Sequence, residues 1–215
     1  MTGTLILVRH GQTFSNVAKK LDTLPPGAAL TPKGHQQARA LAASITERPA
    51  AVISSIALRA RETAGYIADA TGVPLQSLEG LQETYVGDAE DRSDDESHNA
   101  FQDVYRKWLI GDTAASMPGG ESADVVLARF VSALDSLNDA LESGDVYVVS
   151  HGAAIRLVAC VLAGVDPDFA ATNHLDNTET VELVKTSDGW DCVRWGAHVP
   201  PFEASPTESA DDPMG

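Results

Sequence analysis

The sequence predicts an α/β fold, a three-layer α/β/α sandwich in which helices cover both faces of a mainly parallel mixed sheet. Short apolar runs rich in β-branched residues alternate with segments of helical periodicity along most of the chain. Two of these runs, 4–8 and 146–149, each deliver a histidine followed by glycine, at His10 and His151, just before a helix-like segment. Ligands bind at the carboxyl ends of strands in such sheets. If the two strands are parallel neighbours, both imidazoles face one crevice.

The first half of the chain supplies three expected strands and three expected helices. The helix at 32–46 has the clearest start, because Thr31 suits the N-cap position and Pro32 the first turn. Gly72 is a natural stop for the next helix, and two prolines make 22–27 a loop. The expected strands are 4–8, 51–54 and 74–78, and the expected helices are 14–21, 32–46 and 57–70.

Residues 79–120 have a different character and are expected to form a cap or insertion over the main sheet. They contain a helix expected at 95–110 and an acidic run in which only Arg92 opposes six acids. The acids of this run are Asp88, Glu90, Asp91, Asp94, Asp95 and Glu96.

The second half continues with a long amphipathic helix and an almost wholly apolar one, which should be buried. The expected elements are the helix 122–142, the strand 146–149, the helix after Gly152 and a terminal hairpin of 180–184 with 192–196. Residues 203–215 hold four acids and no base, which predicts a disordered acidic tail. Residues 1–202 are therefore expected to form a single domain that includes the cap.

Composition restricts the classes of partner. The chain has 215 residues and a net charge of −16, which argues against nucleic acid and anionic membranes as partners. No window approaches 18 consecutive apolar residues, so no membrane span is expected. The two cysteines, Cys160 and Cys192, are expected to be reduced and buried. These features favour a cytoplasmic protein, and they leave a homodimer open.

Four side chains are expected to converge at the carboxyl edge of the sheet. Arg9 and His10 follow the first strand, Arg59 lies in the first turn after the second, and His151 follows the fourth. Two guanidinium groups, two imidazoles and nearby helix N-termini form a cationic pocket that suits a phosphate monoester. Each residue alone has a plainer interpretation: a histidine before a helix is often a cap, and Arg59 alone is a solvated helix residue.

One imidazole in such a pocket could attack phosphorus and form a phosphohistidine. A carboxyl group must then protonate the leaving oxygen and later activate water, and Glu83, just after the third strand, is the candidate. Zinc is disfavoured, because His10 and His151 lack a carboxylate at ligand spacing and two arginines would repel a cation. No metal or other cofactor is expected.

Several ordered motifs resemble the histidine phosphatase superfamily, the phosphoglycerate mutase-like group. The segment 7–13, with Asn16 after it, resembles the family signature, and 150–152 resembles its second-histidine motif. Further matching segments are 30–38, 55–64, 81–87 and 118–122. The resemblance covers nearly the whole ordered chain and implies a phosphoglycerate mutase-like fold.

The resemblance also implies roles for individual residues. It implies a phosphohistidine at His10 formed without metal, with Glu83 as the proton donor. Arg9, Arg59 and His151 would hold the phosphoryl group, assisted by Asn16. Gly152 of the second-histidine motif and Gln12, which stands where many members have Glu, are taken as further phosphate-binding positions.

Two departures from the family pattern concern substrate choice. The loop 22–27 replaces a Gly- and Asp-containing turn, and Asp91 stands where the family usually has Gly. The acidic run has a plain interpretation as a solvated loop. The sharper hypothesis is that it lies near the pocket mouth and repels a second phosphate on the substrate.

The sequence therefore predicts a phosphatase acting on a small phosphorylated substrate. A cofactor-dependent mutase is the first alternative, but it needs further basic groups in the cap, where Arg92, Arg106 and Lys107 stand among many acids. A non-catalytic phospho-ligand binding module is the second. Binding alone needs neither a nucleophile nor a proton donor, which argues against that module.

Overall fold

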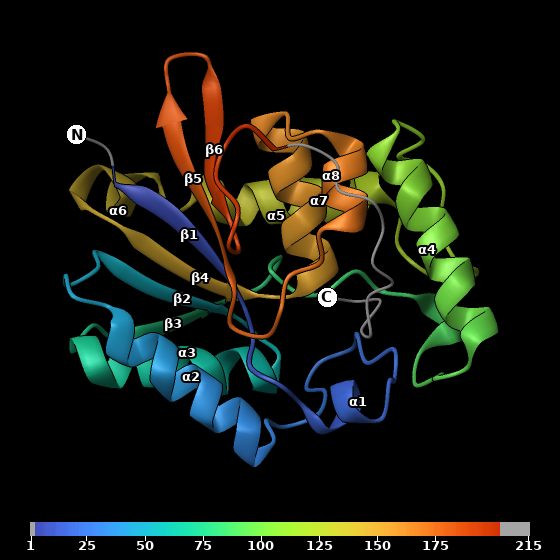
Figure 1. The fold of residues 1–215 in the computed structure, drawn as a ribbon, viewed down its shortest axis with the longest axis horizontal. Coiled ribbons are helices and arrows are strands. Elements are labelled where there is room, and N and C mark those ends of the chain that lie inside the picture. Colours follow the sequence, from blue (N-terminus) through green and yellow to red (C-terminus); the bar gives the residue numbers. More distant parts are fainter. Residues whose placement is uncertain (1–2, 203–215) are drawn as a thin grey trace.

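A computed structural model describes residues 3–202 as one six-stranded sheet with helices on both sides (Figure 1). The strand order is β3-β2-β4-β1-β5-β6. Strands β1 to β4 are mutually parallel, and β5 and β6 add an antiparallel edge. The strands are β1 (Thr4–Arg9), β2 (Ala51–Ser55), β3 (Leu75–Leu78), β4 (Val146–Ser150), β5 (Thr180–Thr186) and β6 (Gly189–Trp195). The mainly parallel mixed sheet expected from the sequence is confirmed.

The two strands that lead to the histidines are parallel neighbours, as the sequence analysis required. Leu5 pairs with Val146, and the register runs to Arg9 opposite Ser150. The backbone N–H of His10 donates to the carbonyl of Ser150 at 3.1 Å, which extends the pairing by one step. The segments that follow β1 and β4 therefore leave the sheet side by side, at the same edge.

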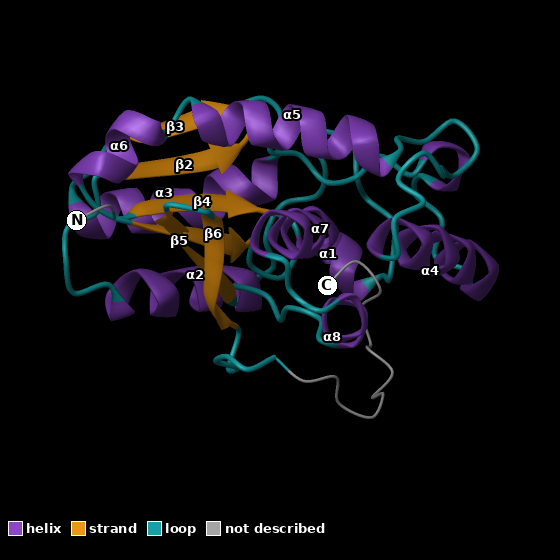
Figure 2. Ribbon diagram, turned by 90° about the horizontal axis from the view of Figure 1, so that it is seen from above, coloured by secondary structure: helices purple, strands orange, loops and turns teal. Residues whose placement is uncertain are grey.

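Helices form a layer on each side of this sheet. Figure 2 shows α5 and α6 on one side and α2 on the other. Leu5 and Leu7 of β1 pack in the core cluster that includes α5 and α7, whereas Ile6 and Val8 pack in the cluster that includes α2 and α3. This alternation is the period of two expected for a strand buried on both faces. The helices are α1 (Phe14–Val17), α2 (Pro32–Ser44), α3 (Leu58–Thr71), α4 (Asp95–Leu109), α5 (Ala123–Asp135), α6 (Asn138–Ser143), α7 (Gly152–Ala163) and α8 (Pro167–Thr172), with a 3-10 turn η1 (Gly87–Ala89).

The helix start predicted at Thr31-Pro32 and the helix stop predicted at Gly72 are confirmed at α2 and α3. The Thr31 hydroxyl accepts a hydrogen bond from the N–H of Gly34 and Pro32 occupies the first turn, so α2 begins as expected. At the end of α3, Gly72 adopts φ 68° and its N–H donates to the carbonyl of Ala68. A side chain at that φ would be strained, which explains the glycine.

The first helix is much shorter than predicted. Instead of running over 14–21, α1 ends at Val17, and Lys19 adopts a left-handed φ of 52°. The N–H of Leu21 then donates to the carbonyl of Arg92, and the Leu21 side chain is fully buried. A tertiary contact with the acidic run therefore replaces the helical hydrogen bonds.

The long helix predicted at 122–142 is two helices, α5 and α6. The Ser136 hydroxyl donates to the carbonyl of Ala133 and the Asn138 amide to that of Asp135, which satisfies carbonyls at the break. Leu137 between them stays buried, so the apolar periodicity continued through the break. The helix α8, begun by an Asp166 cap, was not predicted, and the hairpin strands are longer than expected.

The helix α4 of the predicted cap shares a core cluster with α7. Phe101, Tyr105 and Trp108 are buried in that cluster, and the Tyr105 hydroxyl donates to the carbonyl of Ala153. Within residues 3–202, no helix has both the length and the apolar character needed to cross a membrane. The predicted tail, 203–215, lies outside the described residues.

Candidate active site

The four side chains predicted to converge do meet at the carboxyl edge of the sheet. Arg9 ends β1, His10 follows it, Arg59 lies in the first turn of α3, and His151 is the N-cap residue of α7. The imidazole rings of His10 and His151 are 5.2 Å apart between centroids. The Nε of Arg59 lies between them, donating to Nε2 of His10 at 3.1 Å and to Nδ1 of His151 at 3.2 Å. All four side chains are buried.

The hydrogen bonds of His10 assign its tautomer. Its Nδ1 lies 2.8 Å from the carbonyl oxygen of Gly11, which can only accept, so Nδ1 carries the proton. The Nε2 atom therefore presents a lone pair to Arg59. Burial, then the charges of Arg59 and Arg9, hold the pKa of His10 well below its usual 6.5. A neutral imidazole with a lone pair at the pocket is the state that a nucleophile needs.

His151 has the opposite orientation. Its Nδ1 accepts the bond from Arg59, and its Nε2 lies 2.8 Å from the Ser55 hydroxyl oxygen, so Nε2 carries the proton. Burial first, then Arg59 and His10, also hold the pKa of His151 well below 6.5. The hydroxyl oxygen of Ser55 accepts a further hydrogen bond from the N–H of Ala57, which fixes the serine in place.

The Glu83 carboxylate lies at the N-terminus of α7. One oxygen accepts from the N–H groups of Thr84 at 2.8 Å and Ala154 at 2.9 Å, and the other from Ala153 at 3.2 Å. These bonds and the Arg59 charge favour the anion, but burial outweighs them and raises the pKa of Glu83 above its usual 4.5. A carboxyl group with a raised pKa is suited to donate a proton near neutral pH.

Arg129 of α5, which the sequence analysis did not single out, holds the Glu83 segment. Its guanidinium donates to the carbonyls of Gly80, Gln82 and Glu83 at 2.7 to 2.8 Å and pairs with the Glu121 carboxylate at 2.9 Å. The segment around Glu83 lies outside the helices and strands, so these bonds replace the support that such an element would supply. An arginine on an amphipathic helix carries no local signal of this role.

A small cavity opens at this cluster. Five of the predicted site residues line it, and so do four polar residues that the sequence analysis did not single out. The predicted ones are Arg9, His10, Asn16, Arg59 and Glu83, and the others are Thr13, Ser15, Lys20 and Asp22. Little in the sequence indicates these four polar residues. Lys20 and Asp22 reach the cavity only because α1 ends early, at Val17.

Three predicted site residues do not line the cavity. His151 lies directly behind Arg59, and Gly152 is the buried first residue of α7. The Gln12 side chain is turned away, because its carbonyl oxygen accepts a hydrogen bond from the Thr31 hydroxyl at 2.9 Å. Phosphate binding by Gln12 therefore stays a prediction that this geometry does not support.

Asp22, in the loop that departs from the family pattern, contacts Arg59. Its backbone carbonyl accepts from Nη2 of Arg59 at 2.8 Å, and its carboxylate lies 3.5 Å from Nη1. Nη1 is nevertheless buried without a hydrogen-bond acceptor. A buried donor without an acceptor is costly, so this atom is ready to bind an incoming oxyanion.

The arrangement combines the parts needed to handle a phosphoryl group. Three basic side chains, Arg9, Lys20 and Arg59, line a cavity that also holds a neutral imidazole and a buried carboxyl group. Guanidinium groups bind phosphate oxygens through paired N–H donors. Within residues 3–202, no group of three or more histidine, cysteine or acidic side chains is arranged to hold a metal ion.

The chain is similar to known proteins over most of its length. The chain is 31% identical over 191 residues to "Probable phosphoglycerate mutase GpmB" of Erwinia tasmaniensis, which covers 88% of each chain. The fold matches a mycobacterial glucosyl-3-phosphoglycerate phosphatase solved with inorganic phosphate (TM-score 0.75, 24% identity, 91% and 97% covered). It also matches the alpha-ribazole phosphatase from Shigella flexneri (TM-score 0.70, 23% identity, 88% and 94% covered).

A family model also matches residues 5–198, which include each of the predicted site residues. The chain belongs to branch 1 of the histidine phosphatase superfamily.

Proposed function

We propose that this protein is a metal-independent phosphatase that hydrolyses a small phosphate monoester through a phosphohistidine at His10. One observation carries the proposal. The Nε2 lone pair of His10 accepts a hydrogen bond from Arg59, and one cavity is lined by His10, Arg9, Arg59 and Glu83. A nucleophile, phosphate-binding cations and a proton donor are thus together in one small space.

In the first step, Nε2 of His10 attacks phosphorus and the bond from phosphorus to the ester oxygen breaks. The leaving oxygen takes the proton of Glu83, so an alcohol departs and Glu83 becomes a carboxylate. Arg59 must leave the His10 lone pair to bind phosphoryl oxygens, and its Nη1 is already without an acceptor. Arg9 and Arg59 stabilise the charge on the equatorial oxygens.

In the second step, water attacks the phosphorus of the phosphohistidine. The Glu83 carboxylate takes a proton from that water, the bond from Nε2 to phosphorus breaks, and inorganic phosphate leaves. Glu83 is protonated again and His10 is neutral, so the cycle is closed.

Hydrolysis is favoured over a mutase reaction by the charges near the cavity. Arg92, the one basic residue within the acidic run, is exposed and pairs with Asp94 at 2.7 Å. Of the cap, only Glu83 lines the cavity, so no basic cap side chain is available to hold a carboxylate at the far end of a phosphoglycerate. The solved structures named above are phosphatases, whereas the sequence relative carries a mutase name.

The test is hydrolysis of p-nitrophenyl phosphate by wild type and His10→Ala, with and without EDTA. We expect activity in the wild type, none in the variant, and no effect of EDTA. Wild-type protein quenched during turnover should gain the mass of one phosphoryl group at His10. An assay with 3-phosphoglycerate, with and without 2,3-bisphosphoglycerate, separates phosphate release from isomer formation. Activity retained in His10→Ala would overturn the nucleophile assignment.

A further inference from the structure

A second cavity adjoins the one that holds His10. It is open to solvent and shares Ser15 and Asp22 with the first. Its other lining residues are Leu24, Gly27, Ala28, Glu90 and Asp91. The two cavities have walls in common. If the phosphate of a monoester occupies the first cavity, its alcohol group can therefore extend into the second.

Arg59 lies where the two cavities meet. A Cβ atom added to Gly27, in the wall of the second cavity, would lie 2.2 Å from Nη1 of Arg59. This Nη1 atom is buried and lacks a hydrogen-bond acceptor. A phosphoryl oxygen bound there would direct its ester group toward the segment from Asp22 to Ala28.

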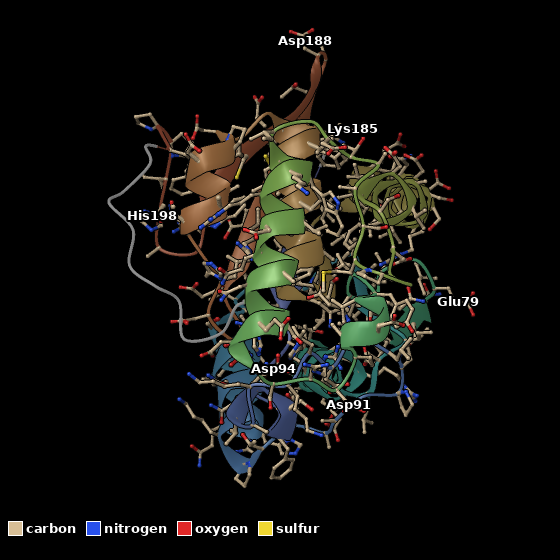
Figure 3. The ribbon with its side chains drawn as sticks, turned by 90° about the vertical axis from the view of Figure 1, so that its right-hand side faces the viewer. Glu79, Asp91, Asp94, Lys185, Asp188 and His198 are labelled. Atoms are coloured by element: carbon tan, nitrogen blue, oxygen red, sulfur yellow. The ribbon has the colours of Figure 1, made fainter. Side chains whose placement is uncertain are left out.

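The two cavities differ in charge. Three basic side chains line the first, together with the carboxyl groups of Asp22 and Glu83. The second is lined by three carboxylates, those of Asp22, Glu90 and Asp91, and by no basic side chain. Figure 3 shows Asp91 between α4 and the N-terminal part of the chain, near Asp94 at the start of α4. Two cations oppose these carboxylates: Lys20 lies 3.4 Å from Asp91 and Arg59 lies 3.5 Å from Asp22, and both line the first cavity.

Two of the three carboxylates, those of Glu90 and Asp22, are held by hydrogen bonds from backbone N–H groups, whereas the Asp91 side chain is 77% exposed and only its backbone is held. Glu90 accepts hydrogen bonds from the N–H groups of Thr23 at 2.8 Å and Leu24 at 3.0 Å, and from the Thr23 hydroxyl. Asp22 accepts from the N–H of Ala28 at 2.9 Å. The N–H of Asp91 donates to the carbonyl of Leu21 at 2.8 Å. Fixed charges at the wall of a cavity act on whatever enters it.

We propose that this second cavity, the leaving-group subsite, selects phosphate monoesters whose alcohol carries an ammonium group and discriminates against alcohols that carry a carboxylate or a second phosphate. The inference rests on the proposed phosphatase function and adds the chemical class of the substrate. Each wall carboxylate attracts a cation and repels an anion. At a separation of about 8 Å in a largely aqueous setting, one such charge changes affinity about two- to six-fold.

The experiment compares three small esters with the wild-type protein: O-phosphoethanolamine, glycerol 3-phosphate and 3-phosphoglycerate. They place a cation, a neutral diol and an anion in the subsite. We expect kcat/KM to fall in that order, with a difference between the first and the last of about ten-fold or more. The discrimination should shrink as ionic strength rises, because salt screens charges in an open cavity.

Asp91→Asn tests the carboxylates directly. Asp91 adopts a left-handed φ of 63°, which asparagine tolerates, so the variant removes a charge while keeping the backbone. The matched control is Asp95→Asn, which removes a charge from the same acidic run but lines neither cavity. We expect Asp91→Asn to reduce the ratio of kcat/KM for phosphoethanolamine to that for phosphoglycerate at least about four-fold, mainly through KM, because the charge acts on the cation and the anion with opposite signs. Asp95→Asn should leave the ratio unchanged.

Equal or better turnover of 3-phosphoglycerate by the wild type would overturn the inference, and so would an equal change of the ratio in both variants. Hydrolysis of p-nitrophenyl phosphate is measured alongside. Its absence would overturn the phosphatase function itself, whereas a reversed order of the esters would overturn only the subsite. Where an ester is not turned over, its inhibition constant against p-nitrophenyl phosphate gives its place in the order.

Discussion

The two His-Gly turns look alike in sequence and differ in hydrogen bonding. At the end of β1, His10 places its proton on Nδ1, toward the Gly11 carbonyl, and offers Nε2 to the pocket. At the end of β4, His151 places its proton on Nε2, toward Ser55, and offers Nδ1. Only His10 lines the cavity. Two parallel neighbouring strands thus deliver the same dipeptide into different environments, and the local hydrogen bonds distinguish a proposed nucleophile from a proposed phosphoryl-binding group.

The largest expected effect comes from removing His10. His10→Ala should reduce kcat for p-nitrophenyl phosphate by about 10⁴-fold or more, because the proposed phosphoenzyme forms on this imidazole. His35→Ala is the control, since that imidazole pairs with Tyr66 away from the cavity. Comparable losses in both variants would indicate a folding defect in place of a lost nucleophile.

Removing the proton on Glu83 should give the next largest effect. Glu83→Gln should reduce kcat about 10²- to 10³-fold for an alkyl phosphate, whose alcohol needs a proton to leave, and less for p-nitrophenyl phosphate. The raised pKa of Glu83 adds a second expectation. Activity should fall as pH rises through that pKa, because the acid form is lost, and this alkaline limb should be absent in Glu83→Gln. An alkaline limb of unchanged position in the variant would assign the acid to another group.

The lowered pKa values of the two histidines predict a pH-dependent stability. Between their folded pKa values and 6.5, the unfolded chain binds protons that the folded chain does not, so the free energy of unfolding falls as pH decreases below 6.5. Each histidine contributes a slope of up to about 1.4 kcal/mol per pH unit. Urea unfolding at pH 5 and pH 7 should show a smaller pH difference for His10→Gln than for the wild type. An identical difference would mean that His10 titrates normally in the folded protein.

The smallest effect sharpens the comparison of the two imidazoles. Ser55→Ala removes the partner of Nε2 in His151 and should cost about 1 kcal/mol of stability, together with a several-fold loss of kcat/KM. Ser54→Ala is the matched control, because Ser54 is also buried in β2 but pairs with Ser77. Nitrogen NMR of the imidazoles should show a shift of Nε2 in His151, which loses its hydrogen-bond partner, and no change at His10. A change at both rings would mean that Arg59 couples them too tightly for separate roles.

The sequence was most informative where local patterns and tertiary structure agree. The apolar run before His10, the Thr31-Pro32 helix start and the Gly72 stop all predict what the structure shows, because each depends on neighbouring residues alone. The convergence of Arg9, Arg59 and His151 followed from one rule, that parallel strands end at one edge.

Other features depend on contacts that no local pattern records. Asp22 is hydrogen-bonded to Arg59, 37 residues away in the sequence, and Arg129 to the carbonyl of Glu83, 46 residues away. The break between α5 and α6 was missed because Leu137 keeps the apolar period while side chains on either side satisfy the freed carbonyls. The early end of α1 also depends on a distant contact, because the N–H of Leu21 donates a hydrogen bond to the carbonyl of Arg92.

The position of Glu83 at the start of α7 has a mechanical consequence. Its carboxylate is bonded to the N–H groups of Ala153 and Ala154, and His151 is the N-cap residue of the same helix. The proposed proton donor and the proposed phosphoryl-binding imidazole are therefore both held at the N-terminus of one helix, α7. A tilt or shift of α7 would carry both groups together and preserve the spacing between them, while changing their distances from His10, which follows β1, and from Arg59 of α3.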